Sequence, residues 1–254
     1  MTTTAMITGA SSGIGLEFAR QLGARGHHLV LVSNEADRLE MVCAELAETY
    51  GVKAEAVFAD LSVRADVARV AERAGAVDIL VNNAGFGLRK WFLGNERAVE
   101  EALLDVMCRA VLVLSHAAGR GMRDRGEGAI VNVASIAGWV AGGTYSAAKS
   151  WIIAFSEGLA TELAPAGVTV TVLCPGFVRT EFHRRSQISV DKLPDALWLD
   201  AGRVVRDCLA DVDRGRVISV PGPVYKVIAW FARCVPRRYV RSGGKITRHR
   251  PPLR

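Results

Sequence analysis

Short apolar runs rich in Val and Ile alternate with longer amphipathic stretches along most of this 254-residue chain. Most of these runs contain no polar residue, which is typical of strands buried on both faces of a sheet. Repeated strand–helix alternation predicts an α/β fold of three layers, with a doubly wound parallel sheet of about seven strands between two layers of helices. The predicted strands are 5–7, 29–32, 54–58, 79–81, 129–133, 168–173 and 217–220, and the predicted helices are 15–25, 35–50, 63–74, 95–123, 146–164 and 194–213.

Composition excludes several classes of protein. Half of the residues are apolar, which excludes a disordered chain and is enough for one large core. The five cysteines are scattered without a CxxC pair, so we expect neither a disulfide scaffold nor a metal site, and we expect a cytoplasmic protein. The N-terminus lacks the pattern of a signal peptide. No linker or repeat divides the chain, so residues 1–221 are predicted to form a single catalytic domain.

Residues 222–254 are predicted to form a basic C-terminal appendage. The net charge of the chain is +6. Residues 214–254 contain eleven Lys and Arg and no Asp or Glu, so the first 213 residues carry a net charge of −5. Basic residues confined to one end do not predict a nucleic-acid partner. A predicted helix near residues 224–235 combines a basic stripe with Trp230 and Phe231. This pattern favours peripheral membrane contact through residues 224–241, with packing on the enzyme or on a second subunit as an equal alternative.

A glycine-rich segment, TGASSGIG, follows the first predicted strand and leads directly into a helix. Gly9, Gly13 and Gly15 allow the backbone to turn sharply and to approach a ligand closely. The N-terminus of the following helix directs unpaired N–H groups and a positive dipole end toward that turn. A glycine loop at this place in an α/β sheet predicts a site for the pyrophosphate of a dinucleotide.

Polar residues close the next predicted strands along the chain. Asp60 follows the third strand, and Asn82-Asn83-Ala84-Gly85 closes the fourth. Ligands of doubly wound sheets lie beyond the carboxyl ends of the strands. Asp60 is therefore expected near an adenine, and Gly85 near a ribose, although each residue alone is also ordinary in a turn.

A Ser, a Tyr and a Lys form the predicted reactive group. Ser135 ends the fifth strand, and Tyr145 and Lys149 share one face of the helix that follows. A nearby ammonium group is expected to lower the pKa of the phenol, so that Tyr145 exchanges a proton with a carbonyl or an alcohol. Ser135 is expected to hold the same substrate oxygen, while a nicotinamide performs the hydride transfer.

Together, TGASSGIG, NNAG, Ser135, YSAAK and PGFVRT resemble the short-chain dehydrogenase/reductase family over roughly residues 4–182. The resemblance implies a Rossmann-type fold, a nicotinamide cofactor, Tyr145 as acid/base, and a homodimer or homotetramer formed through helices near 95–123 and 146–164. It also implies that Lys149 binds the nicotinamide ribose and that Ser135 orients the substrate. The other implied cofactor-binding residues are Gly9, Ser11, Ser12, Gly13, Ile14, Gly15, Asn34, Asp60, Leu61, Asn83, Ala84, Gly85, Pro175, Gly176, Val178 and Thr180.

The chain departs from the family pattern at two places near the reactive group. Met107 occupies the position of an Asn that helps to hold a water beside the active-site Lys, which puts the proton relay in doubt. The backbone carbonyl at Met107 is still able to hold such a water, so we expect Met107→Asn to be tolerated. Ten residues, instead of about thirteen, separate Ser135 from Tyr145, so the loop of residues 136–144 is expected to reshape the substrate pocket.

The choice between NAD(H) and NADP(H) depends on residues that follow the second strand. Ser33 lacks the acid that usually binds the ribose 2′-hydroxyl of NAD, which favours NADP(H) slightly. Glu35 argues against NADP(H), and Arg38 is placed either to reach a 2′-phosphate or to cover its own helix. The predicted function is an NAD(P)-dependent oxidoreductase that interconverts a carbonyl and an alcohol on a bulky or lipophilic small molecule. The alternative is a dinucleotide-binding sensor or scaffold with little turnover.

Overall fold

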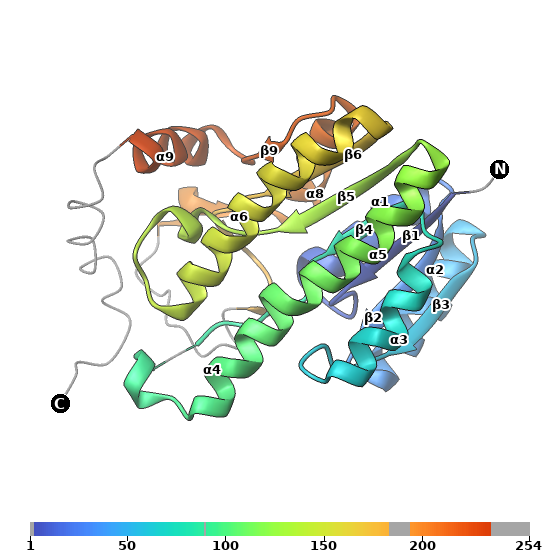
Figure 1. Ribbon diagram of the computed structural model, residues 1–254, viewed down its shortest axis with the longest axis horizontal. Helices are drawn as coiled ribbons and strands as arrows, with labels where there is room; N and C mark the ends of the chain where they lie inside the picture. Colours follow the sequence, from blue (N-terminus) through green and yellow to red (C-terminus); the bar gives the residue numbers. More distant parts are fainter. Residues whose placement is uncertain (1–2, 89, 183–193, 235–254) are drawn as a thin grey trace.

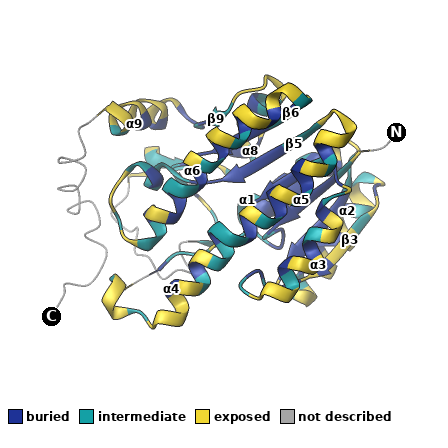
Figure 2. Cartoon of the chain, viewed as in Figure 1, coloured by how far each residue is buried: buried dark blue, intermediate teal, exposed yellow. Residues whose placement is uncertain are grey.

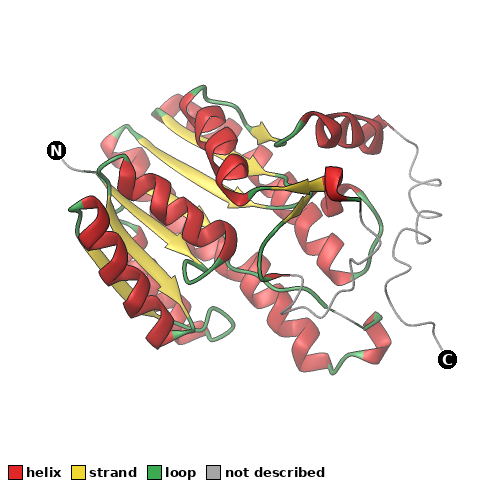
Figure 3. Cartoon of the chain, turned by 180° about the vertical axis from the view of Figure 1, so that it is seen from behind, coloured by secondary structure: helices red, strands yellow, loops and turns green. Residues whose placement is uncertain are grey.

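A computed structural model describes residues 3–88, 90–182 and 194–234. Its centre is a seven-stranded parallel sheet in the order β3-β2-β1-β4-β5-β6-β9, and helices lie on both sides of the strands (Figures 1 and 3). The predicted three-layer Rossmann-type fold is therefore confirmed. The strands of this sheet are β1 Thr4–Thr8, β2 His28–Ser33, β3 Ala54–Phe58, β4 Ile79–Asn82, β5 Gly128–Val133, β6 Val168–Leu173 and β9 Ile218–Ser219.

Two layers of helices cover the sheet because the strands are apolar on both faces. Ile7 of β1 packs in a cluster with α1, α2 and α8, whereas the neighbouring Met6 packs in a cluster with α3, α5 and α6. Adjacent residues of a strand point to opposite faces, so each strand supplies both cores. The helices are α1 Gly13–Ala24, α2 Ala36–Tyr50, α3 Arg64–Ala74, α4 Arg97–Leu104, α5 Ala110–Arg125, α6 Thr144–Leu163, α8 Ala201–Asp213 and α9 Pro223–Cys234.

The strand order places a binding crevice beside β1. The chain passes from β1 to β2 and β3 on one side, and then returns to β4 on the other side of β1. Where the strand order reverses in this way, the connections on the two sides run in opposite directions. They leave a crevice at the carboxyl ends of the strands, where open α/β sheets bind ligands. The glycine loop after β1 and the NNAG segment after β4 meet at this place, as the sequence predicts.

The predicted helix over 95–123 is interrupted in the structure. A π-helical turn, Asp105–Arg109, separates α4 from α5 and contains Met107. By length and composition alone, the helical stretch Arg97–Arg125 could cross a membrane, since an 18-residue window within it has a mean hydropathy of 1.5. In this fold, however, α5 packs against α3, α6 and the sheet, which accounts for its apolar face.

The prediction of one helix over 194–213 is wrong at its beginning. A short 3-10 helix, Asp195–Leu197, leads into β8 (Trp198–Leu199), which pairs in parallel with β7 (Phe177–Val178). The helix α8 begins only after Asp200, whose carboxylate caps it by accepting a 2.9 Å hydrogen bond from the Arg203 amide. Residues 198–199 therefore form a strand that pairs with β7, although the sequence pattern predicts a helix there.

Candidate active site

The glycine loop has no room for side chains at two of its glycines. Gly9 adopts a φ of +65°, and a Cβ there would lie 2.9 Å from Asn83 Nδ2. A Cβ on Gly15 would lie 2.2 Å from the Gly9 carbonyl oxygen. Ser12 precedes α1 without capping it through its side chain, so the first turn of this helix supplies N–H groups to the crevice. The loop therefore fits the pyrophosphate of a dinucleotide.

Asn83 holds the glycine loop in place. Its side-chain amide donates hydrogen bonds to the carbonyl oxygens of Thr8 (2.9 Å) and Gly9 (3.2 Å). The Thr8 hydroxyl accepts hydrogen bonds from the amides of Asn83 (2.9 Å) and Ala84 (3.0 Å). These contacts tie the end of β4 to the end of β1. The expected approach of Asn83 and Ala84 to a ribose stays a prediction.

Asp60 lies at the same edge of the sheet, and its carboxylate accepts hydrogen bonds within a turn. Asp60 Oδ1 accepts hydrogen bonds from the amide (2.9 Å) and the hydroxyl (2.7 Å) of Ser62. The adjacent Leu61 is buried in the core. The ordinary turn role that the sequence allowed for this Asp is thus present, while contact with an adenine remains a prediction.

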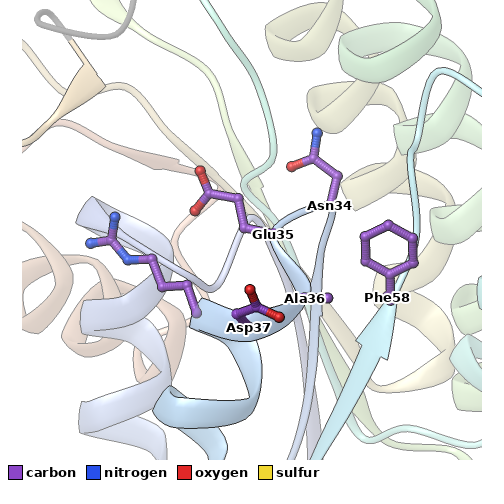
Figure 4. Close-up of a pocket in the computed structure, with 6 residues that line it drawn as sticks. Asn34, Glu35, Ala36, Asp37 and Phe58 are labelled. Carbon is purple, nitrogen blue, oxygen red and sulfur yellow. The ribbon is translucent and has the colours of Figure 1, made fainter.

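A cavity of about 440 Å³ lies beyond the carboxyl end of β2. It includes Asn34, as expected for the adenosine end of a dinucleotide, and Figure 4 shows Glu35 and Phe58 beside it. Ser11 of the glycine loop donates a hydrogen bond to Glu35 Oε2 (3.0 Å), so the cavity and the loop are connected. The lining residues are Asn34, Glu35, Ala36, Asp37, Arg38 and Phe58.

Ser135, Tyr145 and Lys149 lie together, as the sequence predicts. Ser135 begins the 3-10 helix Ile136–Trp139, and a hydrogen bond joins it to Tyr145. Tyr145 and Lys149 lie one turn apart on α6, with Lys149 Nζ 5.7 Å from the centre of the Tyr145 ring. Lys149 is buried and donates a 2.7 Å hydrogen bond to the Val133 carbonyl oxygen, which holds it under the end of β5.

The pKa of Tyr145 is raised in this structure, whereas the sequence predicts that it is lowered. Burial raises the pKa of Tyr145 to about 12, and the hydrogen bond with Ser135 opposes this rise. Burial also lowers the pKa of Lys149 to about 8, because the ammonium form loses its hydration. Tyr145 is therefore protonated at neutral pH in this arrangement, which suits it to donate a proton.

A turn after β6 borders the reactive group. Ser135 Oγ donates a 3.4 Å hydrogen bond to the Pro175 carbonyl oxygen. Gly176 lies against the ring of Tyr225 from α9, since an added Cβ would be 2.1 Å from a ring atom. Val178 belongs to β7, and Thr180 lies beside Gly13, with its Cβ 3.3 Å from an added Cβ there. Of the four predicted residues of this segment, Thr180 lies beside the glycine loop, and the contact of all four with a cofactor stays a prediction.

Tyr225 and Phe182 are neighbours of the site that the sequence reading missed. The Tyr225 hydroxyl donates to the Leu197 carbonyl oxygen (2.6 Å) and accepts from the Phe177 amide (3.2 Å). The Phe182 ring lies 6.2 Å from the Tyr145 ring. Tyr225 lies far in sequence from the recognised motifs, and Phe182 follows the PGFVRT segment without belonging to it, so no motif spacing marks either residue.

Met107 and Gly85 are in contact. Met107 is fully buried, and an added Cβ on Gly85 would lie 2.8 Å from its terminal methyl group. Gly85 is thus required for packing against the π-helical turn, in addition to any approach to a ribose. Ile14, at the start of α1, packs against the core beside α2 and α8.

Among the described residues, the C-terminal helix α9 contacts the rest of the domain along one side. Tyr225 and Ala229 are buried, and Arg233 lies over the Trp139 ring, 6.0 Å from its centre. Figure 2 shows most of α9 as exposed. The exposed apolar residues are Val224, Val227, Ile228, Trp230 and Phe231. The remaining residues of the predicted appendage, 235–254, lie outside the described part of the chain.

No group of His, Cys, Asp or Glu among the described residues is arranged to hold a metal ion.

Known proteins share these features. Residues 3–190 match the family model for short chain dehydrogenase. A putative ketoacyl reductase of Streptomyces coelicolor is 39% identical over 188 residues, which cover 69% of this chain and 70% of the relative. A solved short-chain dehydrogenase from Sphingobium yanoikuyae in complex with NADPH is 34% identical, with a TM-score of 0.85, over 91% of this chain and 92% of that one.

A second solved structure is similar over nearly the whole chain. The bulky-bulky ketone specific alcohol dehydrogenase from Comamonas testosteroni is 28% identical, with a TM-score of 0.81, over 99% of this chain and 96% of that one. These relatives are all named as reductases or dehydrogenases, so the alternative of a sensor or scaffold gains no support. The chain is an NAD(P)-dependent oxidoreductase of the carbonyl/alcohol type, and it belongs to the short-chain dehydrogenase family.

Proposed function

We propose that this enzyme reduces bulky, apolar ketones to alcohols, with Tyr145 as the proton donor. The observation that carries the proposal is the meeting of Ser135, Tyr145 and Lys149 at the sheet edge that also holds the glycine loop and the cavity beyond β2. The reaction consumes one ketone, one reduced dinucleotide and one proton, and yields one alcohol and one oxidised dinucleotide.

The dinucleotide, when bound, supplies a hydride to the carbonyl carbon. The Tyr145 hydroxyl gives its proton to the carbonyl oxygen, while Ser135 holds that oxygen by a hydrogen bond. The phenol is protonated at neutral pH, as this step requires, and desolvation raises its pKa further, to about 12. Lys149, one helical turn from Tyr145, holds the nicotinamide ribose.

The residues proposed to hold the dinucleotide follow the crevice from the cavity to the turn after β6. Gly9, Gly13 and Gly15 let the loop pack closely against Asn83 and Thr180, which places its backbone at the crevice, and Asn34 lines the cavity proposed for the adenosine end. The remaining members are Ser11, Ser12, Ile14, Asp60, Leu61, Asn83, Ala84, Gly85, Tyr145, Lys149, Pro175, Gly176, Val178 and Thr180.

We infer that NADP(H) binds at least as well as NAD(H). Arg38 lines the cavity beyond β2 and offers a cation for a 2′-phosphate. The similar dehydrogenase from Sphingobium yanoikuyae was solved in complex with NADPH, which supports the same choice. Glu35 lines the cavity as well and would repel a phosphate, so we expect the preference to be small.

Apolar and aromatic side chains near Tyr145 support a bulky substrate. Phe182 lies beside the Tyr145 ring, and Trp139 and Phe86 pack in the same apolar cluster as Tyr145. Phe92 and Leu93, in the segment after β4, are exposed. A ketone with two large substituents would bury apolar surface of this kind. The similar alcohol dehydrogenase from Comamonas testosteroni is named as specific for bulky-bulky ketones, which supports the same substrate class.

We propose two further contacts of the folded chain. Leu104 and Leu112, on the helical stretch from α4 to α5, are exposed and support a homodimer or homotetramer through this stretch and α6. The exposed apolar side of α9 supports peripheral contact of a cytoplasmic enzyme with a membrane surface. Sedimentation velocity of the purified protein tests the first contact.

The decisive experiment follows the absorbance of the reduced nicotinamide with a panel of ketones. Aryl ketones, cyclic ketones and acyl thioester ketones are each offered with NADPH and with NADH. The proposal requires turnover of at least one bulky apolar ketone and a lower kcat/KM for acetone-sized ketones. Turnover of acyl thioesters alone would contradict the substrate class, and absence of turnover with either dinucleotide would contradict the function.

A further inference from the structure

An ion pair lies across the adenosine end of the crevice. The Arg38 guanidinium donates two hydrogen bonds to the Glu181 carboxylate, with Nη1–Oε2 at 2.8 Å and Nη2–Oε1 at 3.3 Å. Arg38 belongs to α2, whereas Glu181 follows β7 and is 143 positions later in the chain. Both side chains are only partly exposed, at 40% and 33%, so the pair is accessible to a ligand.

The position of Glu181 connects the phosphate loop with the adenosine end of the crevice. Its neighbour Thr180 lies against Gly13 of the phosphate loop, whereas Glu181 reaches Arg38 at the cavity beyond β2. A ligand that extends from the glycine loop into this cavity therefore passes beside residues 180–181.

The cavity itself offers little to a phosphate. Arg38 is the cation among the described residues that line it, and Glu35 and Asp37 are acids. A 2′-phosphate needs a cation at this place, whereas the two hydroxyls of an unphosphorylated ribose do not. Because Arg38 is already paired with Glu181, a 2′-phosphate must compete with that carboxylate for the guanidinium.

We propose that Glu181 is a specificity-determining residue, which lowers the affinity for NADP(H) relative to NAD(H) by holding Arg38. This inference rests on the proposed dinucleotide site. Loss of the Glu181 charge leaves Arg38 free to bind a 2′-phosphate and removes a repulsive carboxylate from its surroundings. The affinity for NADH, whose ribose makes no use of Arg38, stays the same.

The test compares the Kd of NADPH and of NADH for the full-length protein by fluorescence titration at fixed ionic strength. An exposed ion pair contributes at most about 1 kcal/mol, so Glu181→Gln is expected to tighten NADPH binding by about three- to fivefold. The Kd of NADH is expected to change by less than about twofold, within the usual scatter for a surface substitution. Arg38→Gln is expected to weaken NADPH binding by about tenfold.

Two controls make the test specific. Asp195→Asn breaks another exposed ion pair, Arg179–Asp195, in the segment after β7 and changes the net charge by the same amount as Glu181→Gln. It is expected to leave the ratio of the two Kd values unchanged. In the Arg38→Gln background, Glu181→Gln is expected to lose its effect, as in a double-mutant cycle.

Each other outcome overturns the proposal in a recognisable way. An equal effect of Glu181→Gln on both dinucleotides, or no effect on either, shows that the pair does not select between them. An effect that persists without Arg38, or that Asp195→Asn reproduces, shows a general charge effect. Failure of the unmodified protein to bind either dinucleotide overturns the proposed function together with this inference.

Discussion

At the scale of single residues, the chemistry depends on one partly buried phenol, Tyr145. Desolvation raises the pKa of Tyr145 from its ordinary value of 10 to about 12, so the phenol stays protonated well above neutral pH. Its ring is held between Ser135, Lys149 and Phe182, which come from three different segments. The Ser–Tyr–Lys pattern was visible in the sequence, whereas the direction of the pKa change was not, since desolvation depends on what surrounds the phenol.

We predict that Tyr145→Phe lowers kcat by at least about 100-fold, because general acid catalysis typically contributes this much. The Kd of the dinucleotide should change by less than about threefold, since the glycine loop supplies the phosphate contacts. Single-turnover absorbance and fluorescence titration measure the two quantities. A variant that keeps near-native turnover on a working ketone would contradict the role of Tyr145.

We also predict that buried Lys149 makes the stability of the protein depend on pH. Its pKa of about 8 lies below the ordinary value of 10.5, so the unfolded chain binds more protons between these values. Its contribution to the free energy of unfolding therefore rises with pH from about 8 to 10.5.

Urea unfolding of the native protein and of Lys149→Met at pH 7 and pH 9.5 isolates this contribution. The native protein should gain stability relative to the variant at the higher pH. Between pH 10 and 12 Tyr145 opposes the gain, because its pKa is raised in the fold, so the comparison stops at pH 9.5. A constant difference between the two proteins would show that Lys149 titrates normally.

At the scale of elements, the π-helical turn and α9 support the site from two sides. Met107 on the turn Asp105–Arg109 packs on Gly85 after β4. Tyr225 on α9 packs on Gly176 after β6. Glycines at both contacts let a large side chain approach the backbone closely.

The full burial of Met107 changes the expectation for Met107→Asn. A smaller, polar side chain leaves a cavity and buries an amide, so we expect a loss of about 2–4 kcal/mol in stability. Met107→Leu, which keeps the volume and polarity, should lose less than about 1.5 kcal/mol. Urea midpoints measure both effects. Equal stability of Met107→Asn and the native protein would show that the amide finds a partner in the turn.

Tyr225→Phe tests the contact between α9 and the turn at Gly176. The variant keeps the ring on Gly176 and removes the hydrogen bonds to Leu197 and Phe177. We expect kcat to fall by about three- to tenfold with a nearly unchanged Tm, because Ser135 contacts the same turn through Pro175. Tyr50→Phe, at the distant end of α2, is a control that should leave kcat unchanged. Equal kcat values for native protein and Tyr225→Phe would limit Tyr225 to packing.

At the scale of the whole molecule, α9 presents an exposed apolar side, and the sequence that follows it is basic. Trp230 and Phe231 are 62% and 55% exposed, and residues 235–254 contain seven Lys and Arg. Insertion of each aromatic side chain contributes about 1.5–3 kcal/mol, and each cation near an anionic surface about 1 kcal/mol.

We predict that the protein sediments with phosphatidylserine-containing vesicles and that salt releases part of it. Trp230→Ser/Phe231→Ser should stay in the supernatant while its ketone reduction continues, because neither residue is buried in the domain. This double variant is a cleaner test than deletion of residues 224–254, which also removes Tyr225 from Gly176. If the native protein does not sediment with the vesicles at low salt, the apolar side of α9 is better explained by a contact with a second subunit.

The sequence by itself determined the parallel sheet, the glycine loop and the Ser135–Tyr145–Lys149 set. These features follow from local rules: runs of Val and Ile buried on both faces, glycines at a strand–helix turn, and side chains one helical turn apart. Such patterns involve few consecutive residues, so they can be recognised without knowledge of the fold.

Only the tertiary structure decided what lies between those features. The Arg38–Glu181 pair, the Tyr225 contact with Gly176 and the short β7–β8 sheet join residues that are far apart in the chain. The raised pKa of Tyr145 and the lowered pKa of Lys149 depend on how many neighbours exclude water from each group. Contacts and desolvation of this kind are properties of the packed molecule, because they arise only when distant segments share one space.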